Sequence, residues 1–166
     1  NPDAKIEYNE VKERFEYLTN QMADLQKADT DLRQIISELD DLMRKEFRTT
    51  FNAVAAEFKV MFTRLFGGGS ARLILTDDEN PTETGIDIQA KLPGRREQGL
   101  SLLSGGERSL TAVALIFSLL KVSPTPFCVM DEVDAMLDEA NVGRFTELLK
   151  ELSQETQFIV IAAQEL

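Results

Sequence analysis

Two short segments of the 166-residue chain carry residues that could act on a nucleotide phosphate. The first, residues 103–110, reads LSGGERSL and places two glycines at the start of an apolar helical pattern. The second, residues 127–139, is an apolar run that ends in several acids. A helix N-terminus favours an anion, and carboxylates are ligands that Mg²⁺ prefers. The two segments together indicate a site for a nucleotide phosphate and Mg²⁺.

The glycine segment has a structural and a functional interpretation. Ser104 and Glu107 have the spacing of a capping box, in which both side chains hydrogen-bond to the first turn of a helix. Many helices that bind nothing begin in this way. In the functional interpretation, Gly105 and Gly106 let a ligand approach the backbone without meeting a side chain. The segment alone leaves both interpretations open.

The acidic segment has the Walker B pattern of four apolar residues followed by two acids. Residues 127–130 predict a short, fully buried strand, and Asp131 and Glu132 follow at its end. Asp131 suits Mg²⁺, and Glu132 could orient and polarise an attacking water. A strand that ends in an ordinary polar turn is the alternative. We expect the further acids of residues 134–139 to form a solvated turn rather than a cation site.

The part of a nucleotide site that usually holds the phosphates is missing from the sequence. No G-x-x-x-x-G-K-[ST] loop occurs in it. The chain also begins at Asn1 rather than Met, from which we expect an excerpt of a longer polypeptide.

Composition narrows the classes of function. The formal net charge is −11, which argues against a chain that grips DNA by itself, and we expect Arg95 and Arg96 to be solvated loop charges. One cysteine, Cys128, and no histidine exclude disulfides and Cys/His zinc sites within the chain. The longest mostly apolar stretch, Leu110–Leu120, is too short to span a bilayer. A reducing, cytoplasmic setting is the default.

The first third of the sequence predicts one long helix. Apolar residues recur at alternating spacings of three and four from Tyr8 to Met43, and only Asp29 interrupts this heptad seam. Such a seam needs a partner helix from another chain or from an absent part of this one. After Met43 the register shifts, which indicates that the rod ends and the helix docks on a globular body. We therefore expect a coiled-coil neck over 1–48 and a globular lobe over 49–166.

The rest of the sequence predicts an α/β lobe. Residues 71–76 and 85–92 read as an antiparallel hairpin. A helix over 104–122, the strand over 127–130, a helix over 142–152 and a strand over 158–163 follow. The strand–helix–strand order implies a right-handed crossover and parallel pairing.

These motifs, in this order, carry a resemblance to a known family. LSGGERSLTAVALIF, PTPFCVMDEVDAMLDEANVGRF and TQFIVI resemble the C-terminal half of the ATPase head of prokaryotic-type SMC (structural maintenance of chromosomes) proteins. The resemblance covers nearly the whole chain, including the preceding coiled coil. It implies that this chain is the C-terminal lobe of an ABC-type P-loop ATPase head. In such a head the N-terminal lobe supplies the Walker A loop, and a long coiled coil joins the two lobes.

The resemblance also implies roles for single residues. Two such heads sandwich two ATP molecules, so Ser104, Gly105 and Gly106 would contact the γ-phosphate held by the opposite head. Leu103 and Glu107 would shape this signature turn. On its own head, Asp131 would hold Mg²⁺ and Glu132 would be the general base. Leu137 and Asp138 match the D-loop at the dimer interface.

Partners follow from the same resemblance. It implies an N-terminal head lobe, a second head, a kleisin subunit, and DNA bound through the full complex in the nucleoid, with no membrane. ATPase activity is expected only with the Walker A lobe and not from this chain alone. The histidine that commonly follows the last strand of such heads is absent here. Two alternatives are a related coiled-coil ABC ATPase of DNA repair and a non-enzymatic coiled-coil interaction module.

Overall fold

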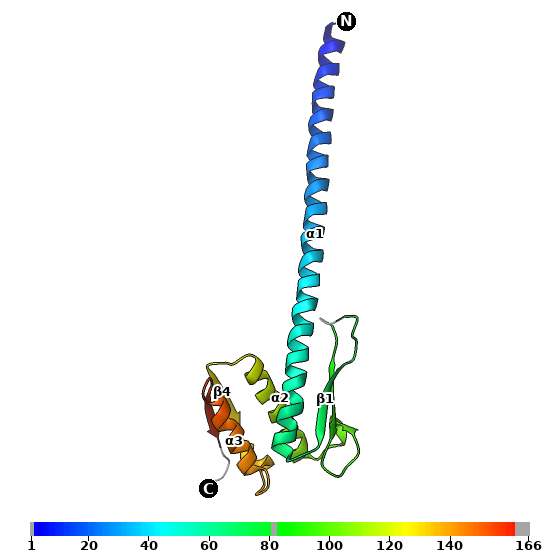
Figure 1. Cartoon of the computed structure of the whole chain (residues 1–166). Coiled ribbons are helices and arrows are strands. Elements are labelled where there is room, and N and C mark those ends of the chain that lie inside the picture. The colour runs from blue at the N-terminus through cyan, green and yellow to red at the C-terminus, as the bar shows by residue number, and fades with distance from the viewer. Residues whose placement is uncertain (1, 81–82, 162–166) are drawn as a thin grey trace. The chain divides into compact units, whose positions relative to one another are not determined.

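The computed structural model describes residues 2–80 and 83–161 and confirms the predicted α/β class with a long N-terminal helix (Figure 1). Its contacts divide the chain into two compact units that meet between Lys45 and Glu46. The helices and strands are α1 (Pro2–Phe66), β1 (Ser70–Leu75), β2 (Ile86–Lys91), β3 (Gln98–Gly99), η1 (Leu100–Leu102), α2 (Gly105–Val122), β4 (Phe127–Asp131), η2 (Val133–Met136), α3 (Val142–Leu152) and β5 (Gln157–Ile161).

The first unit consists of the part of α1 that carries the predicted heptad seam. The helix is confirmed, and the apolar seam residues from Tyr8 to Met43 are each 52 to 70% exposed. Asp29, which interrupts the seam, accepts a hydrogen bond from Arg33 Nε at 2.9 Å one turn further on. A stripe this apolar on an otherwise charged helix is typical of a coiled coil. No helix within the described residues combines the length and apolarity that a bilayer crossing requires.

The second unit begins where α1 becomes buried. The predicted register shift after Met43 is confirmed, because Val54, Phe58, Met61 and Leu65 are at most 5% exposed. Half-buried Phe51 stacks on Phe47 one turn before this stripe, with ring centroids 6.2 Å apart. The C-terminal third of α1 is therefore part of the core of the second unit.

A run of three glycines follows the last residue of α1 and ends the helix. Gly67, Gly68 and Gly69 all have positive φ angles, and the Gly68 N–H donates to the Thr63 carbonyl at 2.9 Å. This bond closes the helix as a Schellman motif. A Cβ at Gly67 would also lie 2.5 Å from the guanidinium of Arg144, whose Nη1 donates to the Leu65 carbonyl at 3.4 Å.

We expect Gly67→Ala to lower the free energy of unfolding by about 1–2 kcal/mol, because φ +69 is unfavourable for a residue with a Cβ. Gly143→Ala is the matched control, since a Cβ there meets nothing within 4 Å and lies inside α3. That change is expected to raise the free energy of unfolding by about 0.5–1 kcal/mol. Thermal unfolding of both variants checks the prediction, and equal stability of the two would contradict it.

The first sheet contains the predicted antiparallel hairpin. Strands β1 and β2 pair from Ser70 opposite Lys91 to Leu75 opposite Ile86, and the unpredicted two-residue strand β3 adds to the free edge of β2. Ala71 and Leu73 on β1 and Ala90 on β2 point into the core. The sheet therefore packs its apolar face on the buried part of α1.

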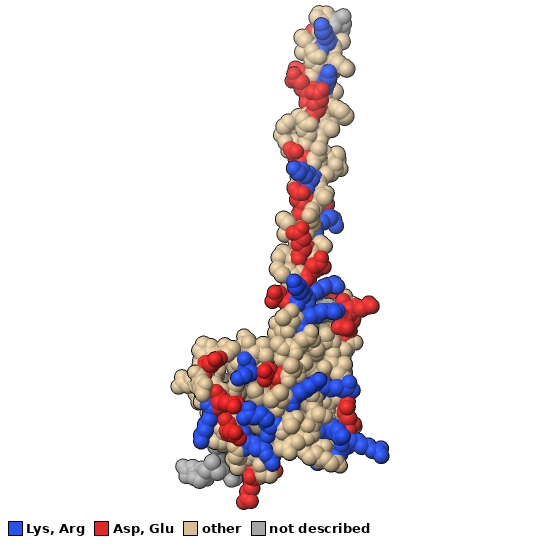
Figure 2. All heavy atoms as spheres, viewed as in Figure 1, with Lys and Arg blue, Asp and Glu red and all other residues tan. Residues whose placement is uncertain are grey.

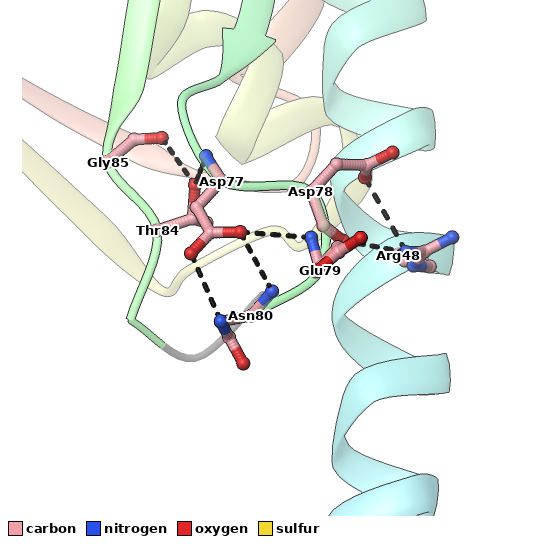
Figure 3. A network of polar contacts seen from close by, with 7 residues as sticks. All are labelled: Arg48, Asp77, Asp78, Glu79, Asn80, Thr84 and Gly85. Carbon is pink, nitrogen blue, oxygen red and sulfur yellow. Dashed lines mark hydrogen bonds and ion pairs between the residues drawn. The ribbon is translucent and has the colours of Figure 1, made fainter.

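The loop between β1 and β2 is tied to α1 by a polar network (Figure 3). Asp77 Oδ1 accepts the N–H groups of Glu79 and Asn80 at 3.1 and 3.3 Å. Its Oδ2 accepts a hydrogen bond from the Asn80 side-chain amide. This bond is the largest cause of the lowered pKa of Asp77. Arg48 donates to the Asp78 carbonyl at 2.8 Å. Hydrogen bonds thus hold residues 77–80 of this loop, and Pro81 and Thr82 lie outside the described residues.

The second sheet contains two parallel strands. The predicted pairing is confirmed, with Phe127 opposite Gln157 and Asp131 opposite Ile161. Helices α2 and α3 cover one face, where Phe117 contacts Phe145 and Phe158 at centroid distances of 5.7 and 6.1 Å. The end of the predicted strand at 162–163 lies outside the described residues.

The prediction that strand 127–130 is fully buried is wrong for this chain. Phe127 is 62% exposed, Val129 53% and Ile159 46%, whereas Met130 is 6% exposed. Side chains alternate between the faces of a strand, so these three residues share the face that α2 and α3 do not cover. The residues are as apolar as a buried strand requires, but the described part of the chain provides no layer for this second face.

Candidate functional site

The glycine turn, residues 103–107, opens α2 with the predicted capping box, which is confirmed. Ser104 Oγ accepts the Glu107 N–H at 3.2 Å, and Glu107 Oε1 accepts the Ser104 N–H at 3.0 Å. Leu103 is 4% exposed, and its N–H donates to the Leu100 carbonyl at 3.2 Å. Packing before the cap and reciprocal hydrogen bonds after it therefore hold the turn in place.

The two glycines of this turn are open to solvent. A Cβ added at Gly105 or at Gly106 would meet nothing within 4 Å, and neither residue has a positive φ. Glycine in a helix is less stable than alanine, so the fold of this chain does not account for two of them here. The capping box uses the N–H groups of Ser104 and Glu107. It leaves those of Gly105 and Gly106 as exposed first-turn donors, and no described residue accepts a hydrogen bond from them.

Several hydrogen-bond donors hold the carboxylate of Glu107 in the turn. The pKa of Glu107 is lowered, and the largest cause is the hydrogen bond from the Ser104 backbone N–H. The Ser104 side chain and the neighbouring Arg95 guanidinium lower it further, whereas partial burial raises it. Arg95 Nη2 lies 2.7 Å from Glu107 Oε2, and its Nη1 lies 3.3 Å from Oε1. A carboxyl with a lowered folded pKa stabilises the fold above its unfolded pKa and loses this contribution as the pH falls. Arg95 is thus paired with Glu107, whereas the sequence predicted a solvated loop charge.

The acidic strand end, Asp131 and Glu132, is exposed and has an unusual backbone. Glu132 has φ +54, the one positive φ among the described non-glycine residues. Its N–H donates to the Ile161 carbonyl at 2.9 Å, which extends the β4–β5 pairing past the last residue of β4. A non-glycine residue in the left-handed region costs about 1–2 kcal/mol. The chain therefore turns sharply at Glu132, and the alternation along β4 places Asp131 on the uncovered face with Val129.

Asp131 is a carboxylate of the kind that binds Mg²⁺ in sites shared with a nucleotide. In such sites one or two carboxylates bind Mg²⁺, and phosphate oxygens and waters complete the coordination. Among the side chains that the structure describes, which exclude that of Asp134, no group of three or more metal-ligating residues gathers. A metal ion held by Asp131 would take its remaining ligands from phosphate and water.

Residues 137 and 138 form the turn that leads into α3. Leu137 packs against the core, and Asp138 is exposed. Asp138 Oδ1 accepts the Asn141 N–H at 2.9 Å, and Asn141 Oδ1 accepts the Asp138 N–H at 2.8 Å. Asn141 is 9% exposed. This reciprocal pair fixes the turn, much as the capping box fixes the glycine turn.

The glycine turn and the 137–138 turn border one pocket of about 310 Å³. Ser104, Gly106 and Glu107 of the glycine turn line it, and so does Asp138. Arg144 also lines it, a residue that sequence reasoning missed because nothing in its neighbourhood suggests a site. Asp131 and Glu132 do not line this pocket, so the structure brings together two of the three predicted groups of site residues and leaves the acidic strand end apart.

Charge on the surface is mixed. Figure 2 shows Lys and Arg side chains interspersed with Asp and Glu along α1 and over the face of the second unit in view. A protein that binds nucleic acid through its backbone usually gathers its cations into a band or patch.

The chain is similar to proteins of known family. A family model described as the RecF/RecN/SMC N terminal domain matches residues 3–166. The chromosome partition protein Smc of Desulfitobacterium hafniense is 51% identical over 162 residues, which are 98% of this chain and 14% of that protein. This chain thus spans about one seventh of the length of that relative.

Solved structures agree with the sequence matches. The Smc head domain of Pyrococcus furiosus, with an extended coiled coil and bound to the C-terminal domain of ScpA, has a TM-score of 0.84 and 40% identity. That match covers 93% of this chain and 39% of the other. A structure from work on ATP-driven dimerization and DNA-stimulated activation of SMC ATPases has a TM-score of 0.64 and 45% identity, with 74% of each chain covered.

Proposed function

The chain belongs to the RecF/RecN/SMC N terminal domain family, and from this premise we propose that it is the C-terminal lobe of an SMC ATPase head with its neck helix. The intact protein would use ATP to partition chromosomes. The family description names an N-terminal domain, so the proposed placement rests on motif content. The chain has the glycine turn and the acidic strand end and lacks the Walker A loop.

One observation supports the split head above others. Within the described residues, the β4–β5 sheet has two strands, carries Asp131 at its end, and leaves Phe127 and Val129 more than half exposed on the same face. Apolar patches on a soluble protein mark a surface that another layer covers. A companion lobe that covers this face would add the Walker A loop next to Asp131. The domain division at residues 48 and 49 belongs to the same proposal.

The two groups of site residues would serve different nucleotides. When ATP and Mg²⁺ are bound, the metal would neutralise phosphate charge. Asp131 would bind the metal of its own head, and Glu132 would accept a proton from the attacking water. Gly105 and Gly106 would donate their exposed N–H groups to the γ-phosphate on the opposite head, with Ser104 beside them. Leu103 and Glu107 would hold this turn, and Leu137 and Asp138 would lie at the head–head interface.

Partners and location belong to the same proposal. A relative of this chain has been solved with the C-terminal domain of ScpA, which supports a kleisin subunit on this lobe or its neck. Another similar structure comes from a study of the ATP-driven dimerization of SMC ATPases, which supports a second head as a partner. DNA would bind to the full complex, in the cytoplasm at the nucleoid. The chain by itself would not hydrolyse ATP, because it lacks the Walker A loop.

Reconstitution tests the proposal. We expect this chain to hydrolyse no ATP alone and to gain ATP turnover and ATP-dependent dimerisation when the Walker A lobe of the same protein is supplied. Val129→Asp, on the uncovered sheet face, should prevent the lobes from joining. Ile86→Asp is the matched control on the other sheet, since Ile86 is 50% exposed. Turnover by the chain alone would contradict the split head.

The alternatives give other results in the same experiment. Partner binding without any ATP-dependent association would support a non-enzymatic coiled-coil module. Binding of a nuclease in place of a kleisin would support a DNA-repair ATPase. The relative from Desulfitobacterium hafniense is a chromosome partition protein, which favours the SMC role.

A further inference from the structure

A loop arginine reaches the glycine turn from outside α2. Arg95 follows the turn that ends β2, where its N–H donates to the Leu92 carbonyl at 3.0 Å and Gly94 has φ +75. The guanidinium then binds both oxygens of the Glu107 carboxylate. The Arg95 side chain is 54% exposed and that of Glu107 is 17% exposed. The contact therefore joins an accessible cation to a mostly buried anion.

Glu107 links this arginine to the backbone of the turn. The oxygen that Arg95 Nη1 contacts, Oε1, also accepts the Ser104 N–H. Two donors from different elements thus fix the rotation of one carboxylate. A bidentate arginine gives a carboxylate more orientation than a single donor does. Without Arg95, the capping hydrogen bond from Ser104 alone would have to hold the side chain.

Charge gives the contact a second consequence. A helix N-terminus attracts an anion through a partial positive charge of roughly half an elementary charge. The carboxylate of Glu107, one turn into α2, opposes that attraction when it has no counter-charge. A glutamate of ordinary pKa is already ionised at neutral pH, and the hydrogen bonds to Glu107 lower its pKa further. Arg95 neutralises this carboxylate without occupying the exposed N–H groups of Gly105 and Gly106.

We infer that Arg95 is a positioning residue for phosphate binding at the glycine turn: through Glu107 it fixes the Ser104 backbone and cancels the carboxylate charge there. This inference rests on the proposed function, since that function supplies the phosphate. Arg95 need not touch the nucleotide, because its two contacts with Glu107 suffice. Arg96, the neighbouring exposed arginine, makes no such contact with Glu107 and provides the comparison.

The test uses the intact protein with five variants: Arg95→Met, Arg95→Lys, Arg96→Met, Glu107→Gln, and Arg95→Met with Glu107→Gln. Glutamine at 107 keeps the capping acceptor and removes the charge. We expect Arg95→Met to weaken ATP-dependent dimerisation about threefold to fivefold, an effect that half exposure of the arginine limits. Arg95→Lys should recover part of it, and Arg96→Met should match the wild type. Nucleotide binding by separate heads should not change.

The double variant shows whether Arg95 acts through Glu107. In the Glu107→Gln background, Arg95→Met should change dimerisation by less than about 1.5-fold, because two residues that act through one contact are not additive. A full Arg95→Met effect in that background would overturn the inference, as a direct contact with nucleotide or the second head would then explain it. Equal effects of Arg95→Met and Arg96→Met would overturn it as well.

Amide hydrogen exchange separates this inference from the proposed function. In the nucleotide-free protein, Arg95→Met should speed exchange of the Ser104 amide about threefold, whereas Arg96→Met should not. If the wild type fails to dimerise with ATP but this difference is present, the proposed function fails and Arg95 still positions the turn. If exchange is the same in both variants, the positioning role is wrong whatever the dimerisation shows.

Discussion

Glu132→Gln in the intact protein is expected to reduce ATP turnover at least about 100-fold while ATP binding persists. A glutamine keeps the size of the side chain and the backbone turn at φ +54 but cannot accept a proton from the attacking water. General-base catalysis typically contributes about 10²–10⁴-fold. ATP-bound dimers should therefore accumulate. Steady-state phosphate release and the elution volume in the presence of ATP measure the two effects.

Glu139→Gln is the matched control for this change. Glu139 is another exposed acid of the same stretch, and the same loss of charge there should leave turnover within about twofold of the wild type. Normal turnover in the Glu132→Gln variant would show that Glu132 is not the base. An equal loss in both variants would point to the overall charge of the stretch instead.

Ser104→Arg is expected to abolish ATP-dependent dimerisation and to leave nucleotide binding by each separate head unchanged. The long side chain would occupy the space before Gly105 and Gly106, where a Cβ now meets nothing and the facing nucleotide would have to enter. Loss of the cap costs about 1 kcal/mol in addition, too little to unfold the head. Light scattering with ATP and nucleotide titration of a dimerisation-incompetent head provide the two readouts.

The same substitution at the other end of α2 is the control. Ser123 is the exposed C-cap of this helix, and an arginine there interacts favourably with the helix dipole. Ser123→Arg should dimerise like the wild type. If Ser104→Arg dimerises normally, the glycine turn does not face the second nucleotide. If it loses nucleotide binding by the separate head, the turn serves the same head as Asp131.

The parts of the structure that follow local rules could be predicted from the sequence. Ser104 and Glu107 define a cap with their spacing, and the structure has that cap. The α3 bounds, Val142–Leu152, match the helix predicted over 142–152. In each case the signal lies within a few residues of the feature. Short-range hydrogen bonds and side-chain periodicity therefore suffice.

Other features depend on groups that are distant in sequence or absent. Exposure of Phe127 depends on which layers cover the sheet, and an apolar run carries no information about that. Pairing of Arg95 with Glu107 depends on how the β2 turn approaches α2, and Arg144 reaches the pocket only once α3 is packed. The site residues themselves remain predictions, since their roles require a nucleotide and a second head.

The backbone conformation at Glu132 implies that the stability of the fold and catalysis favour different residues at this position. Glycine would adopt φ +54 without the cost that glutamate bears, so Glu132→Gly should make the head about 1 kcal/mol more stable while it removes the proposed base. Thermal melting beside turnover would show both effects in one variant. A screen for heat-resistant versions of this protein would therefore tend to select inactive ones at this position.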